Sequence, residues 1–341
     1  MHIMLVRFSS MGDVVIQTSL VEFLKKNIPQ LEITFVTQKL NRVFLDNHPH
    51  IDRTLYYEKK SGQKDLNQLL KLISDIKKTN PDLIIDLHNT LRSKVMRLLT
   101  PSLPHMVVNK RSFWRKLLVL TKKDFLAKQS PQHLRIREDF SRIFNLDVFN
   151  DSDKLTRISA DFDQILTQKK PILVIAPVAS FKTKIWPMEH YEQLIKLLRS
   201  DSYFSQYKIE IIAGPEDRYC SELGQAYSDE LVQNRQGQLS LHETCSLIAS
   251  ARLLIGNDTG MNHIAESFHI PTITLFGSTS PSFGFRPHLV HSDYMYKNIS
   301  CSPCSVTGSK PCHRPTHECM LAIKPEEVHH KIKSILEVQN A

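Results

Sequence analysis

The sequence lacks any apolar stretch approaching the roughly 20 residues that a membrane-spanning helix needs, so we do not expect the chain to cross a bilayer. A secretory signal is not expected either, because Arg7 and Asp13 interrupt the first apolar run and no small-residue cleavage site follows. No repeat, low-complexity segment, helix-turn-helix or RNA-binding signature is present. We therefore expect a cytoplasmic globular protein.

Glycine is scarce, with ten in 341 residues, and the first strand-to-helix turn, RFSSMGDVV, holds a single one. A dinucleotide-binding turn would place three glycines here so that a pyrophosphate can approach the backbone. This turn instead has two serines and a carboxylate, Asp13, at the start of the following helix. The usual dinucleotide fingerprint is thereby excluded, and the carboxylate needs another explanation.

The length fits two domains of about 150 to 170 residues each, and the apolar runs alternate with helical patterns through both halves. This alternation predicts two doubly wound parallel sheets, with domains at 1–165 and 166–322 and a final helix within 323–341. Predicted strands lie at 3–6, 32–37, 53–57, 83–87 and 106–109, and in the runs KKPILVIAPVAS, YKIEIIAGPED, LLIGND and PTITLFGS.

Positive charge gathers in the first half: residues 1–170 carry a net charge of +11 and the remainder −2. It is densest in 110–137, where basic residues alternate with Phe113, Trp114, Leu120 and Phe125. Such a segment suits anionic lipid headgroups, a phosphorylated acceptor or nucleic acid. The alternative is an amphipathic helix packed on its own domain with its charges in solvent.

The stretch LLIGNDTGMNHIAESFHIPTITLFGSTSP, residues 253–281, has two turns suited to phosphate. Asp258, Thr259 and Gly260 stand between a strand and a helix, where backbone amides attract anions, and His263 follows one turn later. Asp258 would otherwise simply cap the helix. Because FGSTSP follows the next strand, the pair of turns favours a nucleotide-diphosphate site at one sheet edge.

Two further strand ends carry candidate groups. APVASFKTKIWPMEHY supplies Ser180 and Lys184, and the lysine could neutralise a departing diphosphate. AGPED supplies Glu216, which is either a ribose-binding carboxylate or a turn residue.

Taken together, RFSSMGDVV, KTKIWPMEHY, GNDTGMNHIA and TLFGSTSP resemble the heptosyltransferases of glycosyltransferase family 9, which build the inner core of bacterial lipopolysaccharide. The resemblance implies a GT-B fold of two Rossmann-like lobes facing a central cleft. The acceptor would bind the N-terminal lobe and ADP-heptose the C-terminal lobe. The last helix would return to the N-terminal domain.

The resemblance also implies a role for each motif. Asp13 matches the general base of an inverting transfer, against the alternative of a plain helix-start residue. Lys184 and Ser180 match diphosphate contacts, and Glu216 matches a ribose ligand. Asp258 matches a group that holds the sugar hydroxyls, and the remaining donor-binding positions are Thr259, Gly260 and His263. Ala179 departs from the pattern, since a second hydroxyl is usual there, and this leaves the donor sugar open.

On the acceptor side, candidate residues in the two N-terminal turns are Ser10, Gly12, His88, Arg92 and Lys94. The implied acceptor is a lipid A/Kdo or heptosylated core, reached at the cytoplasmic face of the inner membrane, with no nucleic acid partner and no cofactor required for catalysis. Two alternatives remain at this point: a GT-B-like nucleotide-sugar epimerase using the same site, and a basic nucleic-acid-binding protein.

Four of the six cysteines, Cys301, Cys304, Cys312 and Cys319, cluster in CSPCSVTGSKPCHRPTHEC. Their spacing is compatible with a structural zinc or iron–sulfur site. The alternatives are reduced thiols or a disulfide, of which the disulfide is disfavoured in a cytoplasmic protein.

Overall fold

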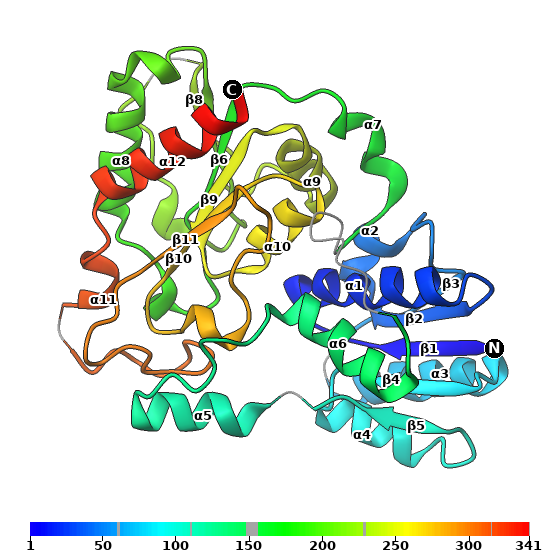
Figure 1. Ribbon diagram of the computed structural model, residues 1–341. Coiled ribbons are helices and arrows are strands. Elements are labelled where there is room, and N and C mark those ends of the chain that lie inside the picture. Colours follow the sequence, from blue (N-terminus) through cyan, green and yellow to red (C-terminus); the bar gives the residue numbers. More distant parts are fainter. Residues whose placement is uncertain (60–61, 110, 148–155, 228–229, 315, 341) are drawn as a thin grey trace. The chain divides into compact units, whose positions relative to one another are not determined.

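A computed structural model describes residues 1–59, 62–109, 111–147, 156–227, 230–314 and 316–340 (Figure 1). The chain forms two compact units. The first comprises Met1–Lys110 with His133–Asp161, and the second comprises Arg111–Gln132 with Phe162–Ala341. Lys110 and residues 148–155 lie outside the described residues.

The first unit is built on a five-stranded parallel sheet in the order β3-β2-β1-β4-β5. Central β1 is fully apolar in its inner positions because helices cover both faces of the sheet (Figure 1). The strands are β1 (His2–Val6), β2 (Glu32–Gln38), β3 (Arg53–Tyr57), β4 (Leu83–Asp86) and β5 (His105–Val107). The helices are α1 (Met11–Asn27), α2 (Arg42–Leu45), α3 (Gln63–Thr79), α4 (Leu91–Leu98) and α6 (Gln132–Phe144).

Helices α3 and α6 are attached to the rest of the first unit by different kinds of contact. Side chains of α3, such as Leu72 and Ile76, pack with Met4 and Ile84 of the sheet in one apolar cluster. Helix α6 is attached to α1 through Ser19, whose hydroxyl donates to the His133 carbonyl at 2.8 Å. The alternation of buried strands and covering helices leaves the carboxyl ends of β1 and β4 as neighbouring loops.

The second unit contains a six-stranded parallel sheet in the order β11-β10-β9-β6-β7-β8. Its strands are β6 (Ile172–Ala176), β7 (Lys208–Ile211), β8 (Val232–Asn234), β9 (Leu253–Asn257), β10 (Thr272–Phe276) and β11 (Asp293–Tyr296). Its helices are α5 (Ser112–Thr121), α7 (Asp163–Leu166), α8 (Met188–Ser200), α9 (Leu241–Ser250), α10 (Gly260–Ser267), α11 (Glu318–Leu321) and α12 (Pro325–Asn340).

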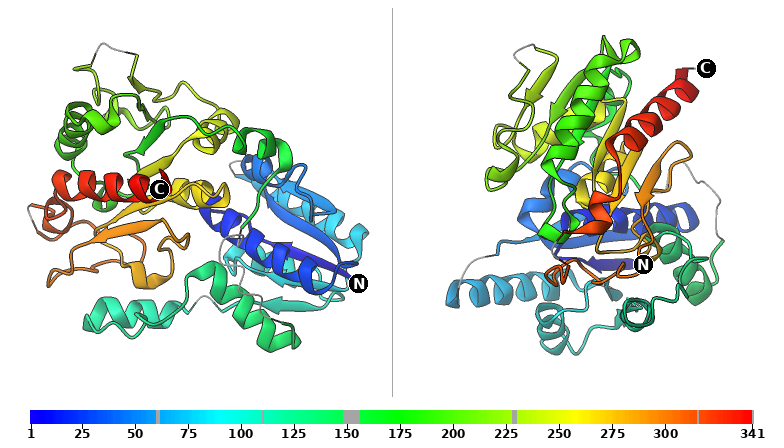
Figure 2. Two further views of the ribbon diagram at one scale, coloured as in Figure 1. Left: turned by 45° about the horizontal axis from the view of Figure 1, so that its top comes forward. Right: turned by 90° about the vertical axis from the view of Figure 1, so that its left-hand side faces the viewer.

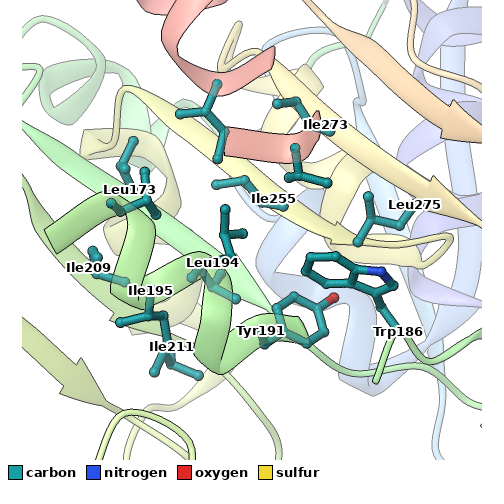
Figure 3. Close-up of a cluster of buried hydrophobic side chains, with 14 of the residues drawn as sticks. Leu173, Trp186, Tyr191, Leu194, Ile195, Ile209, Ile211, Ile255, Ile273 and Leu275 are labelled. Atoms are coloured by element: carbon teal, nitrogen blue, oxygen red, sulfur yellow. The ribbon is translucent and has the colours of Figure 1, made fainter. Parts of the chain in front are cut away.

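A large apolar core fills the space between this sheet and helices α8 and α12, which lie side by side (Figure 2). Trp186 and Tyr191 are fully buried in it, against aliphatic residues of the strands (Figure 3). The Trp186 indole donates to the carbonyl of Ile323 at 3.0 Å, which fixes the chain where it enters α12. The core therefore joins the end of the chain to the second unit.

Two segments are assigned to the second unit by their packing. Helix α12 buries Val328 and Ile332 in the core of the second unit, and the expected return of the last helix to the N-terminal domain stays a prediction. Segment 111–132 also belongs to the second unit, because Leu118 and Leu126 pack on Phe283. The short edge strands β8 and β11 were not predicted, since each has only a few, largely polar residues.

Within the described part of the chain, every helix is either too short or too polar to cross a bilayer.

Buried His48 in the first unit gives a stability prediction that depends on pH. Burial lowers the pKa of His48 to about 3, although a hydrogen bond to the Arg157 carbonyl opposes this shift. The neutral ring is satisfied on both nitrogens, because it also accepts from the His50 amide at 3.1 Å. In the unfolded chain the same group has a pKa near 6.5, so the unfolded state takes up a proton first as the pH falls.

The contribution of His48 is therefore complete above about pH 6.5 and is lost as the pH falls toward 3. Between pH 7 and pH 5 the loss is about 2 kcal/mol. We expect the protection factors for hydrogen exchange in β2 and α2, which correct each rate for the intrinsic exchange rate at the same pH, to fall from pH 7 to pH 5 in the wild type. In His48→Gln, which keeps a donor and an acceptor but does not titrate, the protection factors should fall less. An equal change in both proteins would contradict this assignment.

Candidate functional site

The turn between β1 and α1 holds the Asp13 carboxylate with three contacts to one of its oxygens. Oδ2 lies 2.5 Å from Arg7 Nη2. It also accepts from the Ser10 hydroxyl at 2.8 Å and from the Ser10 amide at 3.3 Å. Oδ1 has no hydrogen-bond or ion-pair partner among the described residues. Oδ2 of Asp13 therefore takes part in capping the helix, and Oδ1 is left available to a substrate.

The electrostatic setting keeps this carboxylate ionised. Burial raises the pKa of Asp13, but the Arg7 charge and the bonds from Ser10 outweigh burial and bring the pKa below the ordinary value of 3.8. The side chain keeps 19% of its surface exposed, so a substrate hydroxyl can reach it. Arg7 is itself fixed by a 2.8 Å bond to the Leu87 carbonyl.

Sequence reasoning did not foresee the role of Arg7. The available signal was a basic residue at the very end of an otherwise apolar strand, immediately before the serine turn.

A cavity of about 430 Å³ lies at the ends of β1 and β4, beside the Asp13 turn. Ser9, His88 and Arg92 line it. The Arg92 guanidinium pairs with Asp65 at 3.2 Å and lies 4.8 Å from the centre of the Tyr57 ring. The cavity is therefore lined by an imidazole, a guanidinium and the Asp65 carboxylate that pairs with this guanidinium.

The other predicted acceptor residues are placed differently. Ser10 and Gly12 belong to the Asp13 turn and do not line this cavity. Lys94 is exposed on α4 and does not line it either.

In the second unit, three loops at one sheet edge bring Lys184, Asp258 and Thr279 together. Lys184 Nζ lies 2.7 Å from Asp258 Oδ2 and donates to the Asp258 carbonyl at 3.1 Å. Thr279 Oγ1 donates to the same carboxylate oxygen at 2.8 Å. These residues follow β6, β9 and β10, which are adjacent in the sheet, so the predicted grouping of the FGSTSP turn with the Asp258 turn is confirmed.

The N-terminus of α10 adds amides and an unsatisfied hydroxyl to this group. Thr259 is the N-cap of the helix, and its Oγ1 is buried without a hydrogen-bond partner among the described residues. Gly260 begins the helix and His263 is buried one turn inside it. A lysine ammonium beside a helix N-terminus concentrates positive potential, because the helix dipole has the same sign there. Such a site suits a diphosphate.

Ser180 and Glu216 follow β6 and β7 at the same edge, but both side chains are exposed. No hydrogen bond or ion pair within the described residues joins either of them to Lys184 or Asp258. Their predicted contacts with phosphate and ribose stay predictions.

The cysteine-rich segment braces the Lys184 turn. The Thr183 hydroxyl donates to the Gly308 carbonyl at 2.5 Å, and His317 Nε2 donates to the Thr183 carbonyl at 2.8 Å. Gly308 has a φ of +89°, and a Cβ added there would lie 2.9 Å from Lys184 Cγ. The close approach of this glycine therefore sets the path of the lysine side chain.

The cysteines of this segment are free thiols. Burial, together with the neighbouring thiols of Cys304, Cys301 and Cys312, raises the pKa of Cys319 to about 12. However, no group of three or more cysteine, histidine or acidic side chains in the described ranges is arranged to hold a metal ion. The described residues, as placed, do not fit the predicted zinc or iron–sulfur site.

The chain is similar to several known proteins. Lipopolysaccharide heptosyltransferase 1 of Campylobacter coli is 28% identical over 309 residues, which cover 83% of this chain and 85% of that protein. The solved Escherichia coli ADP-heptose lps heptosyltransferase II matches all of this chain and all of its own with a TM-score of 0.70 at 19% identity. Escherichia coli heptosyltransferase WaaC with ADP-2-deoxy-2-fluoro heptose also gives 0.70 at 19% identity, covering 98% of this chain and 99% of that one.

These solved structures confirm the predicted GT-B class of two parallel-sheet α/β lobes. Residues 69–312 match the model of glycosyltransferase family 9 (heptosyltransferase). Since this region is more than two thirds of the sequence, the chain belongs to glycosyltransferase family 9 and is a glycosyltransferase, as its motifs predicted.

Proposed function

We propose that this enzyme moves heptose from ADP-heptose to the inner-core region of a lipid A-linked lipopolysaccharide acceptor, with inversion at the anomeric carbon. The observation that carries the mechanism is the Asp13 carboxylate, held ionised with Oδ1 presented. The choice of substrates is supported by the similarity to lipopolysaccharide heptosyltransferases and by the ADP-heptose analogue in the solved structure of one of them.

In the proposed reaction, the acceptor hydroxyl oxygen forms a bond to the anomeric carbon while the bond from that carbon to the diphosphate oxygen breaks. The hydroxyl proton passes to Asp13 Oδ1, and ADP leaves with the electron pair of the broken bond. A carboxylate held in position for such a transfer contributes about 10²- to 10⁴-fold in rate. Arg7 and Ser10 act on Oδ2 and so orient the base without occupying the oxygen that reacts.

The second unit would bind the leaving group. Negative charge grows on the diphosphate as its bond to the sugar breaks, and Lys184 together with the amides at the start of α10 would stabilise it. The unsatisfied Thr259 hydroxyl is a ready donor to a phosphate oxygen. Asp258 would accept bonds from the sugar hydroxyls, with Ser180, Glu216 and His263 as further donor contacts.

The first unit would bind the acceptor. Kdo carboxylates and core phosphates are anions, which Arg92 and His88 in the 430 Å³ cavity would contact, with Lys94 as an outer cation. Because the proposed acceptor is lipid-linked, the enzyme would act at the cytoplasmic face of the inner membrane. The proposed chemistry uses side chains and backbone amides of the protein and requires no metal ion or cofactor.

The test is direct transfer. The full-length protein is incubated with ADP-heptose and isolated truncated lipopolysaccharides, one ending in Kdo and one ending in heptose, while ADP release and acceptor mass are followed. We expect one acceptor to gain the mass of a single heptose, with release of an equal amount of ADP. ADP-heptose binding without transfer to either acceptor would overturn the proposed acceptor, and absence of ADP-heptose binding would overturn the donor.

A further inference from the structure

Helix α5 packs on the second unit through one face. Leu118 is buried against Leu126 and Phe283. On the same side, the Arg115 guanidinium lies 5.0 Å from the centre of the Phe285 ring. At the C-terminal end of the helix, Lys122 Nζ donates to the Cys301 carbonyl at 3.0 Å. These contacts orient the helix on its unit and determine which of its faces is exposed.

The outward face is apolar as well. Phe113, Leu117 and Leu120 are spaced at i, i+4 and i+7, which places them on one side of the helix. Phe113 is 68% exposed and Leu120 is 80% exposed. Trp114, 46% exposed, extends this surface, and its ring contacts Phe113 with the centroids 5.6 Å apart. Amphipathic helices that face water have no reason to carry such a second apolar side.

Exposed lysines flank this apolar face in the sequence. Lys116 lies within α5, and Lys123 and Lys128 follow the helix. The nearby acidic group, Asp124, is turned to its own unit, where it accepts from the Ser282 hydroxyl at 2.5 Å and the Leu126 amide at 3.0 Å. Exposed Phe125 lies next to these lysines in the chain, and its ring is 6.4 Å from that of Trp114.

We propose that the outward face of α5, defined as Phe113, Trp114, Leu117 and Leu120, inserts into the interface of an anionic lipid bilayer. Aromatic and leucine side chains with flanking lysines are the composition of helices that lie in the headgroup region. The lysines complement the negative surface of such a leaflet. The inference rests on the proposed function only in that a lipid-linked acceptor gives the enzyme a reason to reach a membrane.

Trp114 provides a built-in reporter for the test. The sequence has two tryptophans, and Trp186 is fully buried in the second unit, so a change of environment at the surface affects Trp114. The full-length protein is mixed with vesicles of phosphatidylethanolamine and phosphatidylglycerol, without donor or acceptor. We expect a shift of tryptophan emission to shorter wavelength, quenching by lipids brominated near the headgroup, and cosedimentation that weakens with salt.

Three variants separate the contributions. Phe113→Ser/Leu117→Ser/Leu120→Ser should lower vesicle partitioning by at least about tenfold while keeping the reporter. Lys116→Gln/Lys123→Gln/Lys128→Gln should abolish the preference for anionic over zwitterionic vesicles. Val290→Ser, which alters an exposed apolar residue elsewhere in the same unit, is the matched control and should bind like wild type. Thermal unfolding of each variant shows whether it folds.

The proposal is overturned if the wild type shows no emission shift, or if the serine variant folds and partitions like wild type. It is also overturned if the serine variant only loses self-association in sedimentation while vesicle binding is absent, since a second copy would then cover this face. Because neither substrate is present, failure here leaves the transfer assay with truncated acceptors to decide the proposed function by itself.

Discussion

Replacing Asp13 with asparagine is expected to lower kcat by about 10²- to 10⁴-fold, because the amide cannot accept the acceptor proton. Asparagine has nearly the same shape and can still accept from Ser10, so the start of α1 should persist. ADP-heptose affinity should stay close to that of the wild type, since the donor groups lie in the second unit. Single-turnover transfer, with donor binding measured separately, checks both expectations.

The asparagine variant leaves the buried Arg7 charge without its partner, which could affect folding. The double variant Arg7→Gln/Asp13→Asn removes both charges and serves as the control. If the double variant unfolds at the wild-type temperature and has the same low kcat as Asp13→Asn, the loss of activity is due to the missing base. A kcat within a few-fold of wild type in either folded variant would mean that Asp13 is only a helix cap.

Arg7 gives the same hypothesis a pH readout. With its pKa held below 3.8, Asp13 stays ionised throughout the neutral range, so its protonation should not limit kcat/KM above about pH 5. In Arg7→Gln the main opposing charge is gone, and burial then raises the pKa of Asp13. The acidic limb of kcat/KM should therefore move to higher pH. An unchanged acidic limb would show that Arg7 does not control this group.

The first sheet was predictable because its strands are buried on both faces and read as continuous apolar runs between helical patterns. Asp13 was singled out because a carboxylate stands where glycines are usual in such a turn, and its predicted role as a base came only from the resemblance to the family. The contact of Asp13 with Arg7 was not predicted, because it depends on side-chain conformations that the spacing in the sequence does not determine. The Leu87 carbonyl that fixes Arg7 is 80 residues away in the sequence.

The same limit applies to the second unit. Lys184 and Asp258 could be proposed from their places at strand ends, because parallel strands bring these ends to one edge. The contact of Gly308 with Lys184 joins positions more than 120 residues apart and depends on the fold of a loop without regular structure. For α5 the sequence left several interpretations open, since both of its faces are apolar and periodicity alone does not say which one is buried.

Replacing Lys184 with methionine is expected to lower kcat/KM by about 10²- to 10³-fold, the usual cost of removing one preorganised group from a site of developing charge. Methionine keeps most of the length and apolar contacts of the lysine stem. The loss should be larger in kcat than in ADP-heptose binding if the lysine acts mainly on the leaving diphosphate. Equal losses in both would mean that it only holds the ground-state donor.

Gly308→Ala tests whether the position of this amine matters as well as its presence. The new methyl group would meet the Lys184 side chain at 2.9 Å, and the backbone would bear strain at a φ of +89°. Gly62→Ala is the matched control, because Gly62 also has a positive φ, +58°, but has open space around it. Both variants should lose a similar amount of stability. Only Gly308→Ala should also lower kcat. The added methyl group would push the Lys184 side chain away from the diphosphate, and backbone strain alone, as in Gly62→Ala, would not.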